Sequence, residues 1–115
     1  MVKTIVVDIS NNVKIINIPL TSKDVQKKAT AVLKTPLIKK YIKNYEKGTI
    51  KNLESWDLED NNKLLLFGYS NGININNTNI SKNKYYGDIL IVKVTKSLNI
   101  IDIDFEEFND YFKTN

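Results

Sequence analysis

The residues Gly68-Tyr69-Ser70-Asn71-Gly72 match the pattern G-x-S-x-G, which surrounds the nucleophilic serine of many hydrolases. In those enzymes a histidine takes the proton of the serine hydroxyl, and the serine lies on a sharp turn between a strand and a helix. This chain has no histidine, and the residues after Gly72 predict a strand or a loop. We therefore interpret the motif as a turn, in which Asn71-Gly72 is a strong two-residue hairpin signal.

Three carboxylates stand at alternate positions near the C-terminal end, at Asp102, Asp104 and Glu106. Carboxylate oxygens are ligands that Mg²⁺ prefers, so a Mg²⁺-dependent enzyme is one interpretation. The alternation also turns Ile101, Ile103 and Phe105 toward the core, so we expect the carboxylates to face solvent, with Asp104 as the cap of a helix. Cysteine and histidine are absent, which excludes thiolate and imidazole ligands. The sequence therefore favours a protein without catalytic residues, metal or cofactor.

Lysines are concentrated between positions 34 and 51, where six lysines accompany a single acidic residue, Glu46. In a helix over 36–47, four of these lysines lie opposite or beside the apolar stripe, and two tyrosines lie at its border. Together they form the candidate binding surface: Lys39, Lys40, Lys43, Lys47, Tyr41 and Tyr45. Such a surface is suited to phosphate contacts and base stacking, whereas many charged helix faces only keep a protein in solution.

All 17 basic residues are lysines, and arginine is absent. Bidentate hydrogen bonds to phosphate, carboxylate or guanine are therefore not available to this protein. Residues 1–56 contain 11 lysines and four acidic residues, a net charge of +7, whereas residues 57–115 contain six lysines and nine acidic residues, a net charge of −3. A chain with a basic and an acidic part is able to bind a polyanion, a partner of mixed charge or a second copy of itself.

The chain of 115 residues has the length of one domain, residues 1–115, and is too short for two hydrophobic cores. Hydrophobic residues make up 42% of it and charged residues 26%, which excludes a disordered chain. No apolar run reaches the roughly 18 residues needed to span a membrane, and the N-terminus lacks the pattern of a secretory signal. We therefore expect no membrane partner.

The elements in the first half follow from the apolar pattern. Residues 2–9 and 13–18 are rich in β-branched residues and predict a hairpin. A stripe at helical spacing then predicts a helix that begins at Thr21 and runs through Val25, Ala29, Val32 and Leu33. Thr35-Pro36 ends this helix and starts the second one, over 36–47, because proline fits the first helical position.

The second half predicts mostly strands. Residues 53–58 and 63–69 form a second hairpin, and the segments 64–67 and 89–94 are apolar on both faces, which is typical of central strands. The asparagine-rich segment 73–84 predicts an edge strand or a long loop. A short helix follows Asp104, with phenylalanines on its inner face. Because strands and helices do not alternate, we expect an α+β domain: a mostly antiparallel sheet of five to seven strands, with two or three helices packed on one face.

The order of these motifs resembles a known group of proteins over most of residues 1–112. A short hairpin precedes Lys27-Lys28-Ala29, Trp56 opens the central strands, Asn83-Lys84-Tyr85 leads into Tyr86-Gly87-Asp88, and Asp104-Phe105-Glu106-Glu107-Phe108 starts the last helix. In this pattern the chain resembles a family of small uncharacterised proteins of nucleocytoplasmic large DNA viruses, the giant viruses. The family carries a proline-rich stretch before its Tyr-Gly motif, where this chain has Asn79-Ile80-Ser81-Lys82.

The resemblance implies a viral protein of the host cytoplasm or the virion, and it supplies no catalytic residue. We expect a small non-enzymatic module for protein–protein interaction, or one associated with the virion, that binds a viral or host protein through its surface. Segment 73–84 offers an exposed loop or an edge for strand addition. The alternative is a nucleic-acid-binding protein without sequence specificity that uses the lysine-rich helix 36–47. Either function is compatible with a homo-oligomer.

Overall fold

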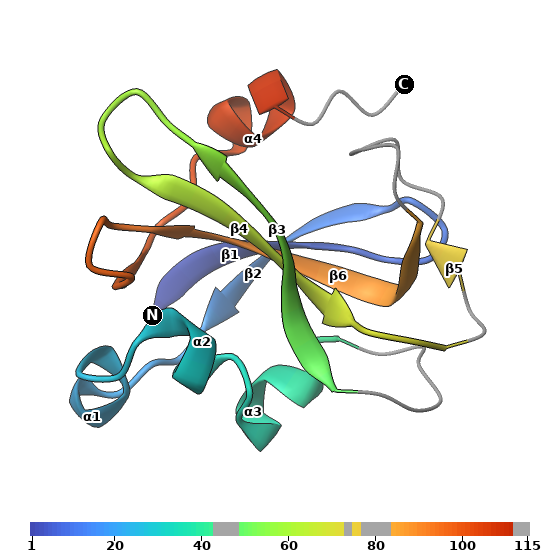
Figure 1. The fold of residues 1–115 in the computed structure, drawn as a ribbon, viewed down its shortest axis with the longest axis horizontal. Coiled ribbons are helices and arrows are strands. Elements are labelled where there is room, and N and C mark those ends of the chain that lie inside the picture. The colour runs from blue at the N-terminus through green and yellow to red at the C-terminus, as the bar shows by residue number, and fades with distance from the viewer. Residues whose placement is uncertain (43–48, 73–74, 77–83, 112–115) are drawn as a thin grey trace.

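The chain begins with a β-hairpin at one edge of the sheet (Figure 1). In the computed structural model, which describes residues 1–42, 49–72, 75–76 and 84–111, strand β1 (Val2–Val7) pairs antiparallel with β2 (Val13–Ile18) over all six residues. Asp8 closes the turn, because its Oδ1 accepts hydrogen bonds from the N–H groups of Ser10 and Asn12, both at 2.9 Å. The hairpin predicted from the β-branched residues is confirmed.

The Asp8 carboxylate makes the stability of this hairpin depend on pH. Partial burial raises the pKa of Asp8, but the N–H groups of Asn12 and Ser10 and the charge of Lys14 outweigh it and hold the pKa below its ordinary value of 3.8. Because the folded-state pKa is lowered, this stabilisation is complete above the ordinary value and is lost as the pH falls through the folded-state pKa.

Between about pH 6 and about pH 2.5, we expect the free energy of unfolding of Asp8→Asn to fall less than that of the wild type, as measured by urea unfolding at each pH. Asparagine keeps the turn, because it accepts the same backbone hydrogen bonds and does not titrate. Asp57→Asn, at an exposed position near the other hairpin, is the charge-matched control. An acid-induced loss of stability in Asp8→Asn as large as that of the wild type would contradict this role.

Helix α1 (Ser22–Val25) begins at a capping box. The N–H group of Thr21 donates to Asp24 at 3.0 Å, and the N–H group of Asp24 donates to the Thr21 hydroxyl at 3.2 Å. The predicted start of this helix is therefore confirmed. The predicted continuation through Leu33 is wrong, because the N–H group of Ala29 donates to the carbonyl oxygen of Leu98 at 3.0 Å, so the chain leaves the helix after α1.

Two further short helices follow, α2 (Ala29–Val32) and α3 (Pro36–Lys39). Pro36 occupies the first position of α3, as predicted. The chain continues as a turn to Ile42. The rest of the predicted helix over 36–47, residues 43–47, lies outside the described residues.

The sheet is centred on the long strand β6 (Tyr85–Val94). The described strands form one antiparallel sheet of seven strands with the path β2-β1-β6-β4-β3. Strands β3 (Ile50–Asp57) and β4 (Lys63–Tyr69) make the second predicted hairpin, and β7 (Ile100–Ile101) pairs with the end of β6. The segments predicted to be central, 64–67 and 89–94, lie in β4 and β6, which are interior strands.

The chain leaves β4 differently from the hairpin predicted at Asn71-Gly72. The next strand, β5 (Ile75–Asn76), pairs with β6 and not with β4. Tyr86 of β6 has Tyr69 of β4 as its partner on one side and Ile75 of β5 on the other. The chain therefore crosses the start of β6, and the hairpin prediction is wrong because β6 occupies the place beside β4.

Strand β5 is held next to β1 by a buried side chain. The amide of Asn76 donates to the carbonyl oxygen of Val7 at 3.0 Å, which joins β5 to the end of β1. Of the predicted edge strand or loop over 73–84, only residues 75–76 and 84 are described. The remainder of this prediction lies outside the described residues.

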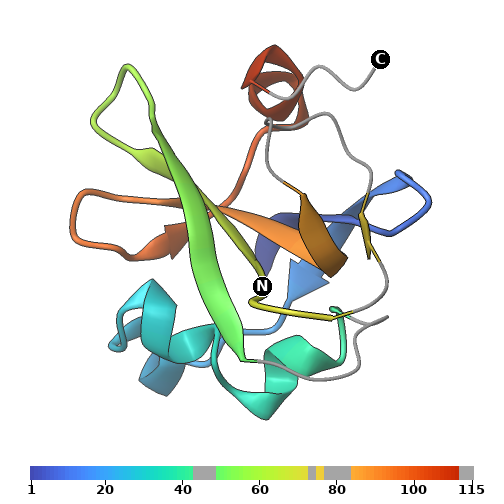
Figure 2. The same cartoon turned by 45° about the vertical axis from the view of Figure 1, so that its right-hand side comes forward.

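Apolar side chains of the strands alternate between the two faces of the sheet, and each face has a hydrophobic cluster. In β1, Val6 belongs to the cluster under α2 and α3, whereas its neighbours Ile5 and Val7 belong to the other. Helix α4 (Phe105–Tyr111) contributes the buried Phe108 to this second cluster, as predicted. The predicted burial of Phe105 is wrong, since its side chain is 41% exposed at the start of the helix, and Phe112 lies outside the described residues. The described helices thus lie on both sides of the sheet (Figures 1 and 2).

This arrangement agrees with the predicted α+β class and with its antiparallel sheet, to which the described residues add four short helices. The expected packing of the helices on one face is not shown. The described helices lie on both sides of the sheet because β4 and β6 are apolar on both faces, so both faces must be covered from water.

Candidate functional site

Three lysines from three different elements surround a hollow of about 230 Å³, which we call the basic hollow. Its lining consists of Lys34, Lys39, Thr49, Ile50 and Lys51. Lys34 follows α2, Lys39 ends α3 and Lys51 lies near the start of β3. These elements meet because buried apolar residues of α2, α3 and β3 belong to the same hydrophobic cluster.

The described charged side chains that line the basic hollow are all positive. Among the described residues, none of its three lysines forms an ion pair, and all three are exposed. Elsewhere in the described part of the chain, Lys14, Lys63 and Lys93 each have a carboxylate within 4 Å. The basic hollow therefore presents charge that no described residue neutralises, beside the apolar floor made by Ile50.

The structure brings only part of the predicted binding surface to this hollow. Lys39 lines it, and Lys40 is exposed at the end of α3. Tyr41 is half-buried and packs against the hydrophobic cluster under α3. Three predicted residues lie outside the described part of the chain: Lys43, Tyr45 and Lys47. In their place the fold supplies Lys34 and Lys51, which belong to the same lysine-rich stretch but fall outside the predicted helix.

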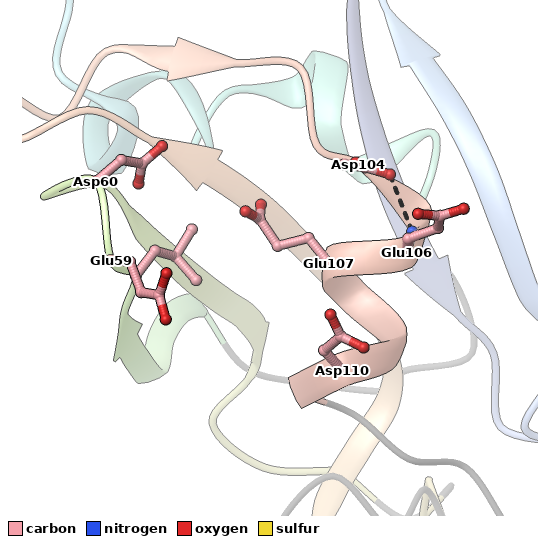
Figure 3. Close-up of a pocket in the computed structure, with 7 residues that line it drawn as sticks. Glu59, Asp60, Asp104, Glu106, Glu107 and Asp110 are labelled. Carbon is pink, nitrogen blue, oxygen red and sulfur yellow. Dashed lines mark hydrogen bonds between the residues drawn. The ribbon is translucent and has the colours of Figure 1, made fainter.

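A second hollow, of about 570 Å³, is lined by carboxylates and is called the acidic hollow (Figure 3). Its lining consists of Leu58, Glu59, Asp60, Asp104, Glu106, Glu107 and Asp110. Figure 3 shows Glu107 and Asp110 on α4 across the hollow from Glu59 and Asp60, which lie in the turn between β3 and β4. The sequence analysis singled out only Asp104 and Glu106 of this lining, and Glu107 and Asp110 follow them on α4. Glu59 and Asp60 could not be placed beside them from the sequence, because they come from a distant turn.

Lys93 of β6 neutralises part of this charge. Its Nζ atom lies 3.2 Å from Oε1 of Glu107 and 3.8 Å from Oδ2 of Asp60. The Lys93 side chain is only 13% exposed, so water screens these interactions weakly. Lys93 therefore joins the central strand to α4 and to the turn between β3 and β4.

We expect Lys93→Met to lower the free energy of unfolding by about 1–3 kcal/mol, because it leaves the half-buried Glu107 carboxylate without its cation. Lys63→Met is the matched control. Lys63 pairs with the exposed Asp57 at 3.8 Å, so its loss should cost less than about 1 kcal/mol. Urea unfolding followed by the fluorescence of Trp56 measures both, and equal losses in the two variants would contradict the linking role of Lys93.

Three other residues considered for chemistry make hydrogen bonds with the backbone. Ser70 lies at an exposed bend, where its N–H group donates to the carbonyl oxygen of Thr49 at 3.2 Å. Asp102 accepts a hydrogen bond from the N–H group of Lys3 at 2.8 Å, and Asp104 caps α4 by accepting from the N–H group of Glu106 at 3.0 Å. Among the described residues, no three potential ligands are grouped to hold a metal ion.

The fold and these hollows define a small α+β domain with one hollow lined by lysines and another lined by carboxylates. Comparison of the chain with known proteins finds no matching protein family, no matching curated sequence and no matching solved structure. The resemblance to giant-virus proteins therefore stays a prediction. In the described part of the chain, no helix has both the length and the apolar character that a membrane span requires.

Proposed function

We propose that this protein is a non-enzymatic binding module whose basic hollow docks an acidic surface of a partner protein. The observation that carries the proposal is the convergence of Lys34, Lys39 and Lys51 from three elements, with no described ion-pair partner for any of them. Three like charges close together repel one another, and an acidic partner offsets this repulsion by supplying the opposite charge.

Two features favour a protein over a small molecule as the occupant. The basic hollow has a volume of about 230 Å³, below the roughly 300–1,000 Å³ typical of ligand pockets. Its lining joins exposed lysines to the apolar Ile50, a combination that suits acidic and aliphatic side chains presented together.

A second candidate is phosphate-directed nucleic-acid binding by the same lysines, which the concentration of positive charge favours. Nucleic-acid binding has less support than protein binding, because no described aromatic side chain lines the hollow for base stacking and the chain has no arginine. Contacts of lysine with phosphate alone would give affinity without sequence preference.

The test is fluorescence anisotropy with two labelled probes of equal charge, a peptide of alternating glutamate and leucine and a single-stranded DNA. Both are titrated at about 50 and about 200 mM salt, the range over which phosphate-driven binding collapses. We expect the peptide to bind more tightly than the DNA and to keep more of its affinity at the higher salt. Tighter, strongly salt-dependent DNA binding would favour the second candidate, and the absence of binding to either probe would contradict both.

We propose further that this binding takes place in the host cytoplasm or the virion of a giant virus. The support for this setting is the resemblance carried by Tyr86-Gly87-Asp88 and the motifs around it. Mass spectrometry of purified virions and of infected cytoplasm tests it, and absence of the protein from both would contradict it.

A further inference from the structure

Strand β2 lies at one end of the path of described strands. It pairs with β1 over six residues without a register shift, and no described strand pairs with its other side. Such a side presents a row of backbone N–H and C=O groups that can pair with another strand. The protein therefore offers a straight template of six residues at this edge of the sheet.

The two edges of the sheet differ in how they are protected. Strand β3, at the opposite edge, has a bulge between Asn52 and Glu54, and it carries the charged residues Lys51, Glu54 and Asp57. Bulges and charges are devices by which proteins prevent pairing at an edge. Strand β2 has no bulge, and its single charged residue, Lys14, lies 3.6 Å from the carboxylate of Asp8. The edge at β2 therefore lacks the protection that β3 has.

An apolar side chain stands exposed at the middle of this edge. Ile15 is 54% exposed and borders a hollow of about 400 Å³. The hollow is lined by Lys3, Ile5, Ile15, Asp102, Ile103, Asp104 and Phe105. Its floor is the buried pair Ile5 and Ile103, and Phe105 is also exposed.

The charges around this hollow have both signs, since Lys3 lines it together with Asp102 and Asp104. A twofold axis brings a surface patch against a copy of itself, so a patch with both signs is able to pair its positive side chain with a negative side chain of the other copy, which a patch of one sign cannot do. The apolar centre and the mixed charges therefore suit a second copy of this chain, whereas the described charges of the basic hollow are all positive and would repel those of its own copy.

We propose that β2 pairs antiparallel with β2 of a second copy, so that the sheet continues through a symmetric dimer. The twofold axis lies perpendicular to the sheet, which keeps each face of the sheet on the same side in both copies. Side chains that lie opposite each other across the axis then point to the same face of the extended sheet, so Ile15 is able to lie opposite Ile15 of the second copy. In this register Lys14 faces Ile16 of the second copy, and no two like charges are directly opposite.

The first test is the oligomeric state in analytical ultracentrifugation. At concentrations on the order of 100 μM we expect a mass of twice 13.2 kDa for the wild type. Ile15→Lys places two like charges opposite each other and should weaken the dimer by at least about tenfold. Val25→Lys is the matched control, because Val25 is also 54% exposed but lies in α1, away from the edge.

The second test uses the absence of cysteine from the chain. Opposite residues of an antiparallel pair have Cα atoms about 4.5–5.5 Å apart, within the range that a disulfide spans. Ile15→Cys should therefore form a disulfide-linked dimer under mild oxidation, and Val25→Cys should not. A monomeric wild type, a dimer that persists in Ile15→Lys, or equal crosslinking at both positions would overturn the proposal. The proposed dimer does not depend on the basic hollow, so substitution of the lysines that line the hollow should leave the dimer intact.

Discussion

Phe108→Ala should lower the free energy of unfolding by about 3–5 kcal/mol, the range for loss of a buried phenylalanine. Phe108 is fully buried in the cluster that α4 shares with the sheet. Helix α4 has seven residues and is too short to be stable on its own, so it depends on this contact. A domain of this size has a total stability of about 5–15 kcal/mol, so the variant should be close to unfolding at 37 °C.

Phe105→Ala is the matched control, since both rings lie on α4 and their centroids are 5.9 Å apart. Phe105 is 41% exposed, so its removal should cost less than about 1.5 kcal/mol, mostly the loss of the contact between the rings. Urea unfolding followed by Trp56, which packs against the same cluster, measures both variants. A loss in Phe105→Ala as large as that in Phe108→Ala would show that α4 is held by another contact.

Reversing the charges of the basic hollow should abolish binding of the acidic peptide. In the triple variant Lys34→Glu, Lys39→Glu and Lys51→Glu, each attraction becomes a repulsion. At about 1 kcal/mol for each charge removed and a similar amount for each charge added, the affinity should fall at least about 100-fold. All three side chains are exposed, so the fold should be kept.

The control is a second triple variant, Lys23→Glu, Lys84→Glu and Lys96→Glu, with the same net charge. These lysines are also exposed but do not line the basic hollow. If the site is local, this control should lose less than about tenfold, the part that comes from net charge alone. Equal losses in the two variants would mean that the peptide responds only to the overall charge of the protein, and the proposed site would then be wrong.

Several features could be predicted from the sequence because they depend on neighbours along the chain. The β-branched residues of the first hairpin, the capping box at Thr21 and Asp24, Pro36 at the start of α3 and Asp104 at the start of α4 all form the expected local contacts. The two segments that are apolar on both faces, 64–67 and 89–94, lie in interior strands of the sheet, where both faces of a strand are covered.

The missing residue types had equally direct consequences. Without histidine, cysteine or arginine, the chain has no imidazole or thiolate ligand and no guanidinium for a bidentate contact. These limits hold for any fold that the chain adopts. The concentration of lysines at positions 34–51 was likewise visible in the sequence. The predicted helix face, however, included only Lys39 of the three lysines that line the basic hollow.

Contacts between distant segments were decided by the tertiary structure alone. The hydrogen bond from Ala29 to Leu98 breaks the predicted first helix, and the position of β6 beside β4 sends the chain across the sheet to β5. Neither of these two contacts can be predicted from the local sequence, because a backbone N–H group bonds equally well to any carbonyl oxygen that the fold brings within reach.

The charged surfaces depend on the same long-range packing. Lys34, Lys39 and Lys51 meet because the apolar residues of α2, α3 and β3 share one cluster, and Lys93 reaches Glu107 and Asp60 because α4 covers the other face of the sheet. The sequence by itself determined which chemical groups the protein has and which segments form its central strands, although β3 and β6 begin three and four residues before the predicted starts at 53 and 89. Only the tertiary structure decided which of these groups face one another, since burial of both faces of the sheet brings α2 and α3 to one face and α4 to the other.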